Sequence, residues 1–201
     1  MSDIETLLAH PDIARIARLL ADRPGVTVDP GPPVRRAAVA LVLRAVPAGE
    51  LEMLMIKRSE HEGDPWSGHV ALPGGRQEPL DRDLLDTALR ETREETGLDL
   101  AAIGRVLGTL DDLHPRTPSL PPIMVRPYVA VVAADVALGA SPEVADAFWV
   151  PLAELRQGTR WIDVTVPIRG ERHTVTAFQH GPYVVWGMTE RLIRQFIALL
   201  T

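Results

Sequence analysis

The segment from Arg90 to Leu98, which reads Arg-Glu-Thr-Arg-Glu-Glu-Thr-Gly-Leu, constrains the fold of this chain more than any other. At about 100° per residue, helical spacing puts its glutamates on one arc and its apolar and threonine positions on another. We predict an amphipathic helix from Leu84 to Thr96, begun by Asp81 or Asp83 and ended by Gly97. The carboxylate arc holds Glu91, Glu94 and Glu95.

Clustered carboxylates on one helix face call for a positive partner, because like charges cost a helix roughly 0.2–0.5 kcal/mol per pair. Arg90 and Arg93 supply part of the compensation. Oxygen ligands also suit a hard cation such as Mg²⁺ or Mn²⁺. The preceding Gly74 and Gly75 allow close backbone approach, so a carbonyl at Gly75 is available to complete a metal shell. The pattern therefore predicts a cation site.

The same acidic helix has a second interpretation as an exposed, charge-rich helix that ends at Gly97. That interpretation is sufficient for the glutamates taken alone. The glycine turn, the glutamate spacing, the arginine and the terminal glycine occur together, however. Their joint occurrence favours the cation site.

This arrangement resembles the Nudix box, in which a glycine, five residues, a glutamate and seven residues precede Arg-Glu, an apolar residue, any residue, Glu-Glu, any residue, glycine and an apolar residue. Thr92 takes the place of the usual aliphatic residue. The interval between Gly75 and Arg90 is one residue longer than usual, and Asp81 stands near the expected glutamate. The residues that match the second half are Arg90, Glu91, Glu94, Glu95, Gly97 and Leu98.

The longer interval with an aspartate looks like the coenzyme A pyrophosphatase branch of that family. Four other stretches are similar to the same branch, so the resemblance covers most of residues 35–200. The chain departs from the branch where residues 64–67 lack a basic residue and where Leu72 replaces a phenylalanine. The similar stretches are residues 57–59, 68–75, 143–152 and 186–189.

The resemblance implies a mixed α/β fold with a mixed β-sheet sandwiched between helices, and Mg²⁺-dependent hydrolysis of a diphosphate bond. With coenzyme A the products would be 3′,5′-ADP and phosphopantetheine. Glu91 and Glu95 would be the principal metal ligands, together with Gly75. Glu94 would bind a second ion or accept a proton, and Arg90 would orient the carboxylates, unless Arg90 forms only a surface ion pair.

Residues outside the acidic helix supply further candidates. Glu143, on a later loop, is our first candidate for the general base. Lys57 and Arg58 end a predicted strand and are expected to bind substrate phosphates, with plain surface charges as the alternative. Trp66 would stack on a base or a pantetheine arm, or be buried for packing. A loop with Asp111, Asp112 and His114 faces either the pocket or solvent.

The rest of the pattern predicts one compact unit, residues 1–201, in which a helical extension (1–34) precedes the core (35–200). Apolar periodicity predicts helices over residues 11–23 and 188–200. We expect a proline-rich loop at residues 115–122. The predicted strands are residues 37–46, 51–56, 106–110, 124–132, 164–168 and 174–178, of which the first pair and the last pair should form hairpins.

Composition excludes several classes of protein. No cysteine is present, so disulfides and zinc–thiolate sites are excluded. The net charge of −6 without a Lys/Arg cluster argues against extended nucleic-acid binding. We expect no membrane span, because charged or turn-forming residues interrupt each apolar stretch, and the acidic start lacks a secretory pattern. The expected location is the cytoplasm.

Two alternatives to a coenzyme A substrate stay open. One is a Nudix hydrolase that acts on a nucleoside diphosphate sugar, a dinucleotide or a damaged nucleoside triphosphate. The other is a Nudix domain that binds a small nucleotide without cleaving it. Oligomeric state also stays open, with a two-fold homodimer as the commonest closed assembly.

Overall fold

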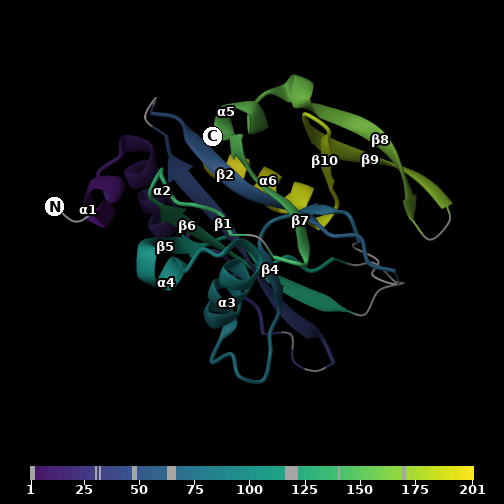
Figure 1. Ribbon diagram of the computed structural model, residues 1–201, viewed down its shortest axis with the longest axis horizontal. Coiled ribbons are helices and arrows are strands. Elements are labelled where there is room, and N and C mark those ends of the chain that lie inside the picture. Colours follow the sequence, from purple (N-terminus) through teal and green to yellow (C-terminus); the bar gives the residue numbers. More distant parts are fainter. Residues whose placement is uncertain are drawn as a thin grey trace.

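A long strand, β1 (Arg35–Ala45), runs through the middle of the main sheet in the computed structural model (Figure 1). It pairs in parallel with β6 (Ile123–Val132) on one side. On the other side it pairs antiparallel with β4 (Gly74–Arg76) and then with β2 (Leu51–Arg58). The sheet is therefore mixed, as predicted. Its other strands are β3 (Val70–Ala71), β5 (Gly104–Thr109) and β7 (Val144–Pro151).

A second sheet of three strands contains β8 (Trp161–Ile168), β9 (Glu171–His180) and β10 (Tyr183–Trp186), and its β8–β9 hairpin projects to the right in Figure 1. The predicted hairpin at these residues is confirmed by the antiparallel register of β8 with β9. Strand β10 has no counterpart among the predicted strands. This short strand lies between Gly181 and Gly187 and is defined by its pairing with β9.

Helices cover both faces of the main sheet, which confirms the predicted sandwich. One face carries α1 (Asp3–Leu8), α2 (Pro11–Asp22) and α6 (Met188–Leu199). The other carries α3 (Leu84–Thr96) and α4 (Leu100–Ile103). The short pieces α5 (Leu152–Leu155) and η1 (Gly158–Arg160) lie between β7 and β8.

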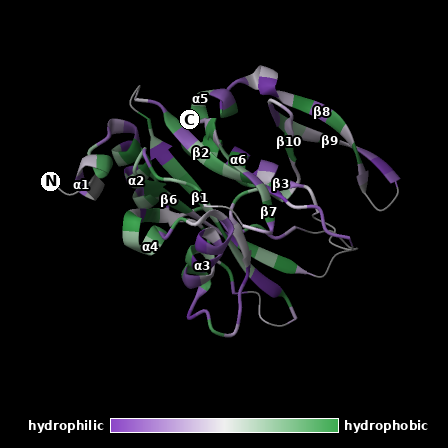
Figure 2. Cartoon of the chain, in the orientation of Figure 1, coloured by the Kyte–Doolittle hydropathy of each residue, from purple (hydrophilic) through white to green (hydrophobic). Residues whose placement is uncertain are grey.

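The apolar run of β1 explains this layering. Its side chains alternate, so that Leu41 and Leu43 enter the core beneath α2 and α6, while Ala40 and Val42 enter the core on the α3 and α4 face. Figure 2 shows the resulting hydrophobic stretch in the interior strands. Each large apolar side chain that is fully buried contributes roughly 1.5–3 kcal/mol. Burial on both faces therefore fixes β1 at the centre.

The structure describes residues 3–29, 31, 33–46, 49–62, 67–115, 122–139, 141–168 and 171–201. Most of the predicted proline-rich loop lies outside these ranges, as do residues 47 and 48 of the first predicted hairpin. None of the described helices combines the length and the apolar character needed to cross a membrane.

Candidate functional site

The acidic helix α3 has the bounds and the two faces that its pattern predicts. Asp83 is the N-cap and its carboxylate accepts a hydrogen bond from the Asp86 N–H, while Gly97 ends the helix at φ 74°. Thr92 is buried on the core face, and its hydroxyl donates to the Ala88 carbonyl at 2.7 Å. The threonine that replaces an aliphatic residue is thus satisfied within the helix.

Gly74 and Gly75 belong to strand β4 and lie directly against two carboxylates of α3. The Gly74 N–H donates to Oε2 of Glu95 at 2.8 Å. A Cβ added at Gly75 would lie 2.3 Å from Oε1 of Glu91. Because β4 pairs with β1, these two glycines lie next to α3. The structure therefore brings Gly75, Glu91 and Glu95 into one site.

Burial makes these carboxylates difficult to ionise. Glu95 is only 3% exposed, and loss of solvation raises its pKa to about 7 despite the Gly74 N–H and the nearby Arg58. Burial also raises the pKa of Glu91, against the effect of Arg90. The negative charge of Glu143 raises the pKa of both groups. A bound cation would favour the ionised form of each.

Arg90 is the centre of an ion-pair network beside this site. Its Nε and Nη2 bind the two carboxylate oxygens of Asp81 at 2.9 and 3.0 Å. Its Nη1 lies 2.9 Å from Glu91 Oε1 and 3.0 Å from Glu94 Oε2. The hydrogen bonds from Arg90 hold the pKa of Asp81 well below its usual range. Arg90 therefore contacts the carboxylates that it was expected to orient, while Glu94 lies at the rim with 54% of its side chain exposed.

Asp81 is the residue whose role the sequence left open. Asp81 and Asp83 were both candidates for the helix cap, and the structure assigns the cap to Asp83. Asp81 is 5% exposed and pairs with Arg90 instead. The sequence signal for a role of Asp81 at the site is its position near the expected glutamate of the Nudix box. The irregular segment between β4 and α3 accommodates the longer interval, because no helical or strand repeat sets its length.

Arg58 lies beside Glu95, and Glu143 is near enough to Glu91 and Glu95 to raise the pKa of both. Arg58 Nη1 lies 3.6 Å from Glu95 Oε1. The backbone of Glu143 is held by Ser59, whose N–H donates to the Glu143 carbonyl at 2.9 Å. Since Glu143 also affects both glutamates electrostatically, the later loop lies at the site.

Other candidates occupy different places. The ammonium of Lys57 donates to the Gly68 carbonyl, at the base of the loop between β2 and β3. Trp66, on that loop, lies outside the described residues. Asp111 accepts from the Val26 N–H, and Asp112 pairs with Arg126 at 2.8 Å.

These contacts give the acidic pair after β5 a structural function. The segment after α2 is attached to it, since the Val28 N–H donates to Asp112 and Arg23 pairs with Asp111. His114 follows on the same loop and is half-buried. The expectation that this loop faces either the pocket or solvent did not include these contacts, through which Asp111 and Asp112 attach the segment after α2.

The residues of the site fit a hard divalent cation. Glu91 and Glu95 offer carboxylate oxygens one helical turn apart, and the missing Cβ of Gly75 leaves space beside Glu91. Among the described residues, no group of three or more His, Cys, Asp or Glu side chains is close enough to hold a metal ion. Mg²⁺ commonly binds one or two carboxylates and takes its other ligands from water and substrate phosphates. Such an ion matches this donor set.

A methyl group at Gly75 should therefore impair cation binding. In Gly75→Ala the new Cβ would overlap the Glu91 carboxylate and push it from its position. We expect about tenfold weaker Mn²⁺ binding, measured by titration calorimetry. Gly158→Ala, where no atom lies within 4 Å of the added Cβ and the backbone φ is not in the left-handed region, is the control for loss of a glycine. Unchanged Mn²⁺ affinity in Gly75→Ala would contradict this placement of the ion.

Comparison with known proteins gives agreement along most of the sequence. A family model described as NUDIX domain matches residues 34–167. An uncharacterized Nudix hydrolase NudL of Yersinia pestis (strain Pestoides F) is 34% identical over 161 residues, which cover 80% of this chain and 77% of the relative. The protein of the same description from Yersinia pseudotuberculosis serotype O:1b (strain IP 31758) gives the same values.

Solved structures support the fold. The NUDIX domain of Shewanella oneidensis NrtR, complexed with ADP ribose, superposes with a TM-score of 0.57 at 22% identity, covering 92% of this chain and 98% of that one. A MutT/nudix family protein from Enterococcus faecalis gives a TM-score of 0.56 at 19% identity, covering 94% and 69%. At these identities the likeness concerns the fold alone.

Proposed function

The chain belongs to the Nudix hydrolase family, and we propose that it hydrolyses a diphosphate bond in a small nucleotide derivative with a divalent cation held by Glu91 and Glu95. One observation carries this proposal. Glu95, which is buried, and Glu91, which is half-buried, lie one turn apart on α3 against β4, where the Gly74 N–H donates to Glu95 and a Cβ at Gly75 would overlap Glu91. Loss of solvation raises the pKa of both carboxyl groups. A buried carboxylate charge costs free energy unless a cation or a proton neutralises it.

The reaction adds water across a P–O–P linkage, so that one phosphorus gains the hydroxyl and the other phosphate leaves with a proton. A bound Mg²⁺ or Mn²⁺ would polarise the phosphoryl oxygens and promote deprotonation of the attacking water. Glu143, which lies on the loop opposite α3, would accept the proton of the attacking water. Arg90 would keep Glu91 in place, and Arg58, beside Glu95, would attract a substrate phosphate.

Glu143 and Glu94 are the two candidates for the base, and their surroundings separate them. Glu94 is bound to Arg90, whereas the Glu143 carboxylate has no hydrogen bond among the described residues. We expect Glu143→Gln to lower kcat about 100-fold and Glu94→Gln less than tenfold, because a positioned base typically contributes 10²–10⁴-fold. Steady-state rates at saturating Mg²⁺ check this. The reverse order would assign the base to Glu94.

For the substrate we propose coenzyme A, supported by the similarity of residues 57–59, 68–75 and 143–152 to the coenzyme A pyrophosphatase branch. Trp66 and Lys57, the latter near the end of β2, are retained as substrate-binding candidates. The NrtR domain that binds ADP ribose favours a second candidate, a nucleoside diphosphate sugar. The same comparison is compatible with a non-enzymatic alternative, a domain that binds a nucleotide without cleaving it. A cytoplasmic location and a two-fold homodimer are further proposals.

A substrate panel tests the function. The protein would be incubated with coenzyme A, ADP-ribose, a dinucleoside polyphosphate and 8-oxo-dGTP, each with Mg²⁺, with Mn²⁺ and with chelator, before chromatography. Cation-dependent release of 3′,5′-ADP and phosphopantetheine would establish coenzyme A as the substrate. Cleavage of another compound would retain the hydrolase and change its substrate. Binding without cleavage of any compound would support the non-catalytic alternative.

A further inference from the structure

Two adjacent residues at the end of β2 contact both segments that carry the acids of the site. Arg58 Nη1 lies 3.6 Å from Glu95 on α3. Ser59 donates twice to the opposite loop, from its N–H to the Glu143 carbonyl and from its hydroxyl to the Pro142 carbonyl, both at 2.9 Å. Consecutive Cα atoms are about 3.8 Å apart. The end of β2 therefore sets the distance between this loop and α3.

The start of β7 contains a bulge opposite Lys57 and Arg58. Lys57 pairs with Asp146 and Arg58 pairs with Val144, so Ala145 is one extra residue on β7. A bulge of this kind bends its strand and redirects the neighbouring side chains. Just before it, Ser141 bridges to Val144 and accepts the Glu143 N–H at 3.3 Å. The backbone at Glu143 thus turns toward Ser59.

A second attachment holds the loop against the end of α3. The Gly139 N–H donates to the Thr96 carbonyl at 2.7 Å. A Cβ at Gly97 would lie 3.1 Å from Gly139, so the two glycine backbones are in close contact. The loop is therefore attached to α3 on one side and to β2 on the other.

We propose that Ser59 is a positioning residue that sets the location of Glu143 relative to Glu91 and Glu95. This inference rests on the proposed function, in which Glu143 accepts a proton. The Glu143 side chain is exposed and its carboxylate has no hydrogen bond among the described residues, so its location depends on its backbone. Ser59 binds that backbone directly. Removal of the hydroxyl alone leaves the Ser59 N–H bond and should displace the loop without unfolding it.

A double-mutant cycle tests the catalytic consequence. We compare Ser59→Ala, Glu143→Gln and the double variant with coenzyme A or ADP-ribose at saturating Mg²⁺. Ser59→Ala should lower kcat about tenfold, since a misplaced group costs up to 10²-fold, and should change KM less than twofold. Ser59→Thr, which keeps the hydroxyl, should restore kcat. In the double variant, the loss of Ser59 should add less than a factor of about two to the effect of Glu143→Gln.

Full additivity would overturn the proposal, because Ser59 would then act independently of Glu143. Wild-type kcat in Ser59→Ala would overturn it as well. If Glu143→Gln keeps full kcat while Ser59→Ala loses it, Ser59 positions some other group and the inference is wrong. The hydrolase itself would survive each of these results.

A second readout needs no turnover. Hydrogen–deuterium exchange of the metal-free protein should show at least about threefold faster exchange at residues 141–144 in Ser59→Ala, and wild-type exchange in Ser59→Thr. Unchanged exchange in Ser59→Ala would contradict the positioning role. If Ser59→Ala exchanges faster but the protein cleaves no substrate, the positioning role is supported and only the proposed function is wrong.

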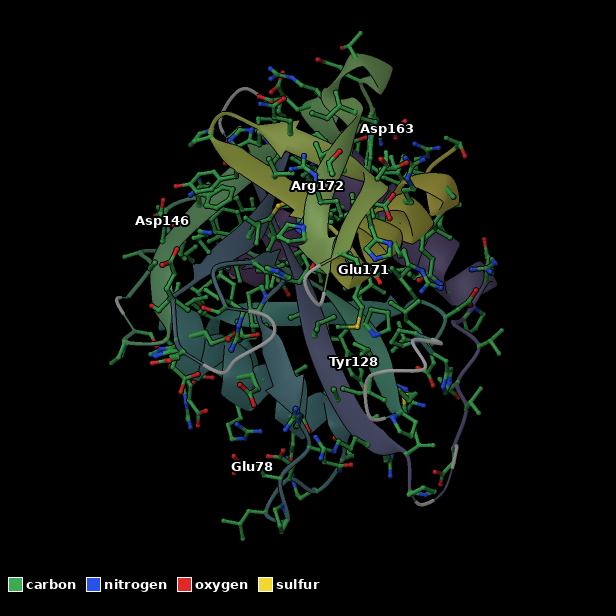
Figure 3. All side chains as sticks on the ribbon, turned by 90° about the vertical axis from the view of Figure 1, so that its right-hand side faces the viewer. Glu78, Tyr128, Asp146, Asp163, Glu171 and Arg172 are labelled. Carbon is green, nitrogen blue, oxygen red and sulfur yellow. The ribbon has the colours of Figure 1, made fainter. Side chains whose placement is uncertain are left out.

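Thr176→Val is the matched control, because it removes a hydroxyl that donates to Asp163 at 3.2 Å on the β8–β9 hairpin. In Figure 3, Asp163 on this hairpin lies toward the top of the molecule, whereas Glu78, which precedes α3, lies at the bottom. The control should leave kcat and the exchange at residues 141–144 unchanged. A loss equal to that of Ser59→Ala would show that the effect is not specific to Ser59.

Discussion

Glu95→Gln is expected to remove most cation-dependent turnover and to stabilise the metal-free protein above pH 7. Glu95 is buried with its pKa raised to about 7, so its ionised form is costly without a cation. Glutamine keeps an oxygen for the Gly74 N–H and carries no charge. We expect turnover to fall at least about 100-fold, since a catalytic cation supplies several kcal/mol.

The sign of the stability effect follows from proton binding. The folded protein holds a proton on Glu95 up to about pH 7, whereas the unfolded chain loses it near the ordinary value of 4.5. The contribution of this group to stability is complete below pH 4.5 and is lost as pH rises through 7. The glutamine variant avoids that loss, which is on the order of 2 kcal/mol.

Thermal unfolding in chelator at pH 5 and pH 8 measures this effect. The variant should exceed the wild type in Tm mainly at pH 8, and Mg²⁺ should raise the Tm of the wild type only. Glu94→Gln is the control, because Glu94 is largely exposed. Equal Tm values of Glu95→Gln and wild type at pH 8, together with normal turnover, would defeat the assignment of Glu95 as a ligand.

Asp81→Asn should destabilise the protein by about 2–3 kcal/mol, because it leaves Arg90 with one fewer charged partner at a site where Arg90 is 18% exposed and Asp81 only 5%. Turnover should also fall, since Arg90 holds Glu91. Urea unfolding at pH 7 gives the stability. Because the pKa of Asp81 is depressed, this contribution is complete above the ordinary carboxyl pKa and is lost as pH falls below it.

Asp86→Asn is the matched control for this change. Asp86, in the first turn of α3, pairs with the exposed Arg82 just before the helix, and such solvent-accessible pairs contribute little to stability. A loss of stability in Asp86→Asn as large as in Asp81→Asn would assign the effect to general helix electrostatics. A clear difference would assign it to the Arg90 network.

The sequence by itself determined the elements whose cause is local. The bounds of α3 follow from a cap, an apolar repeat and a terminal glycine that lie within the helix or beside it. Glu91 and Glu95 share a face because four residues make about one helical turn. The apolar run of β1 likewise predicted a strand, and the structure buries it on both faces. These features need no knowledge of distant residues.

Only the tertiary structure decided which distant residues meet those elements. Gly75 lies against Glu91 because β4 pairs with β1, and Asp81 rather than Asp83 binds Arg90 because the intervening segment folds back on the helix. The contact of Lys57, a candidate for phosphate binding, with the Gly68 carbonyl is another contact that only the fold shows.

The bonds from Ser59 to residues 142 and 143 span more than 80 positions of sequence. Contacts of that kind depend on strand pairing and on a bulge, which satisfy backbone groups far apart in the chain. Composition and periodicity describe only neighbours along the chain. The acidic helix could therefore be predicted in detail, whereas the loop that faces it required the fold.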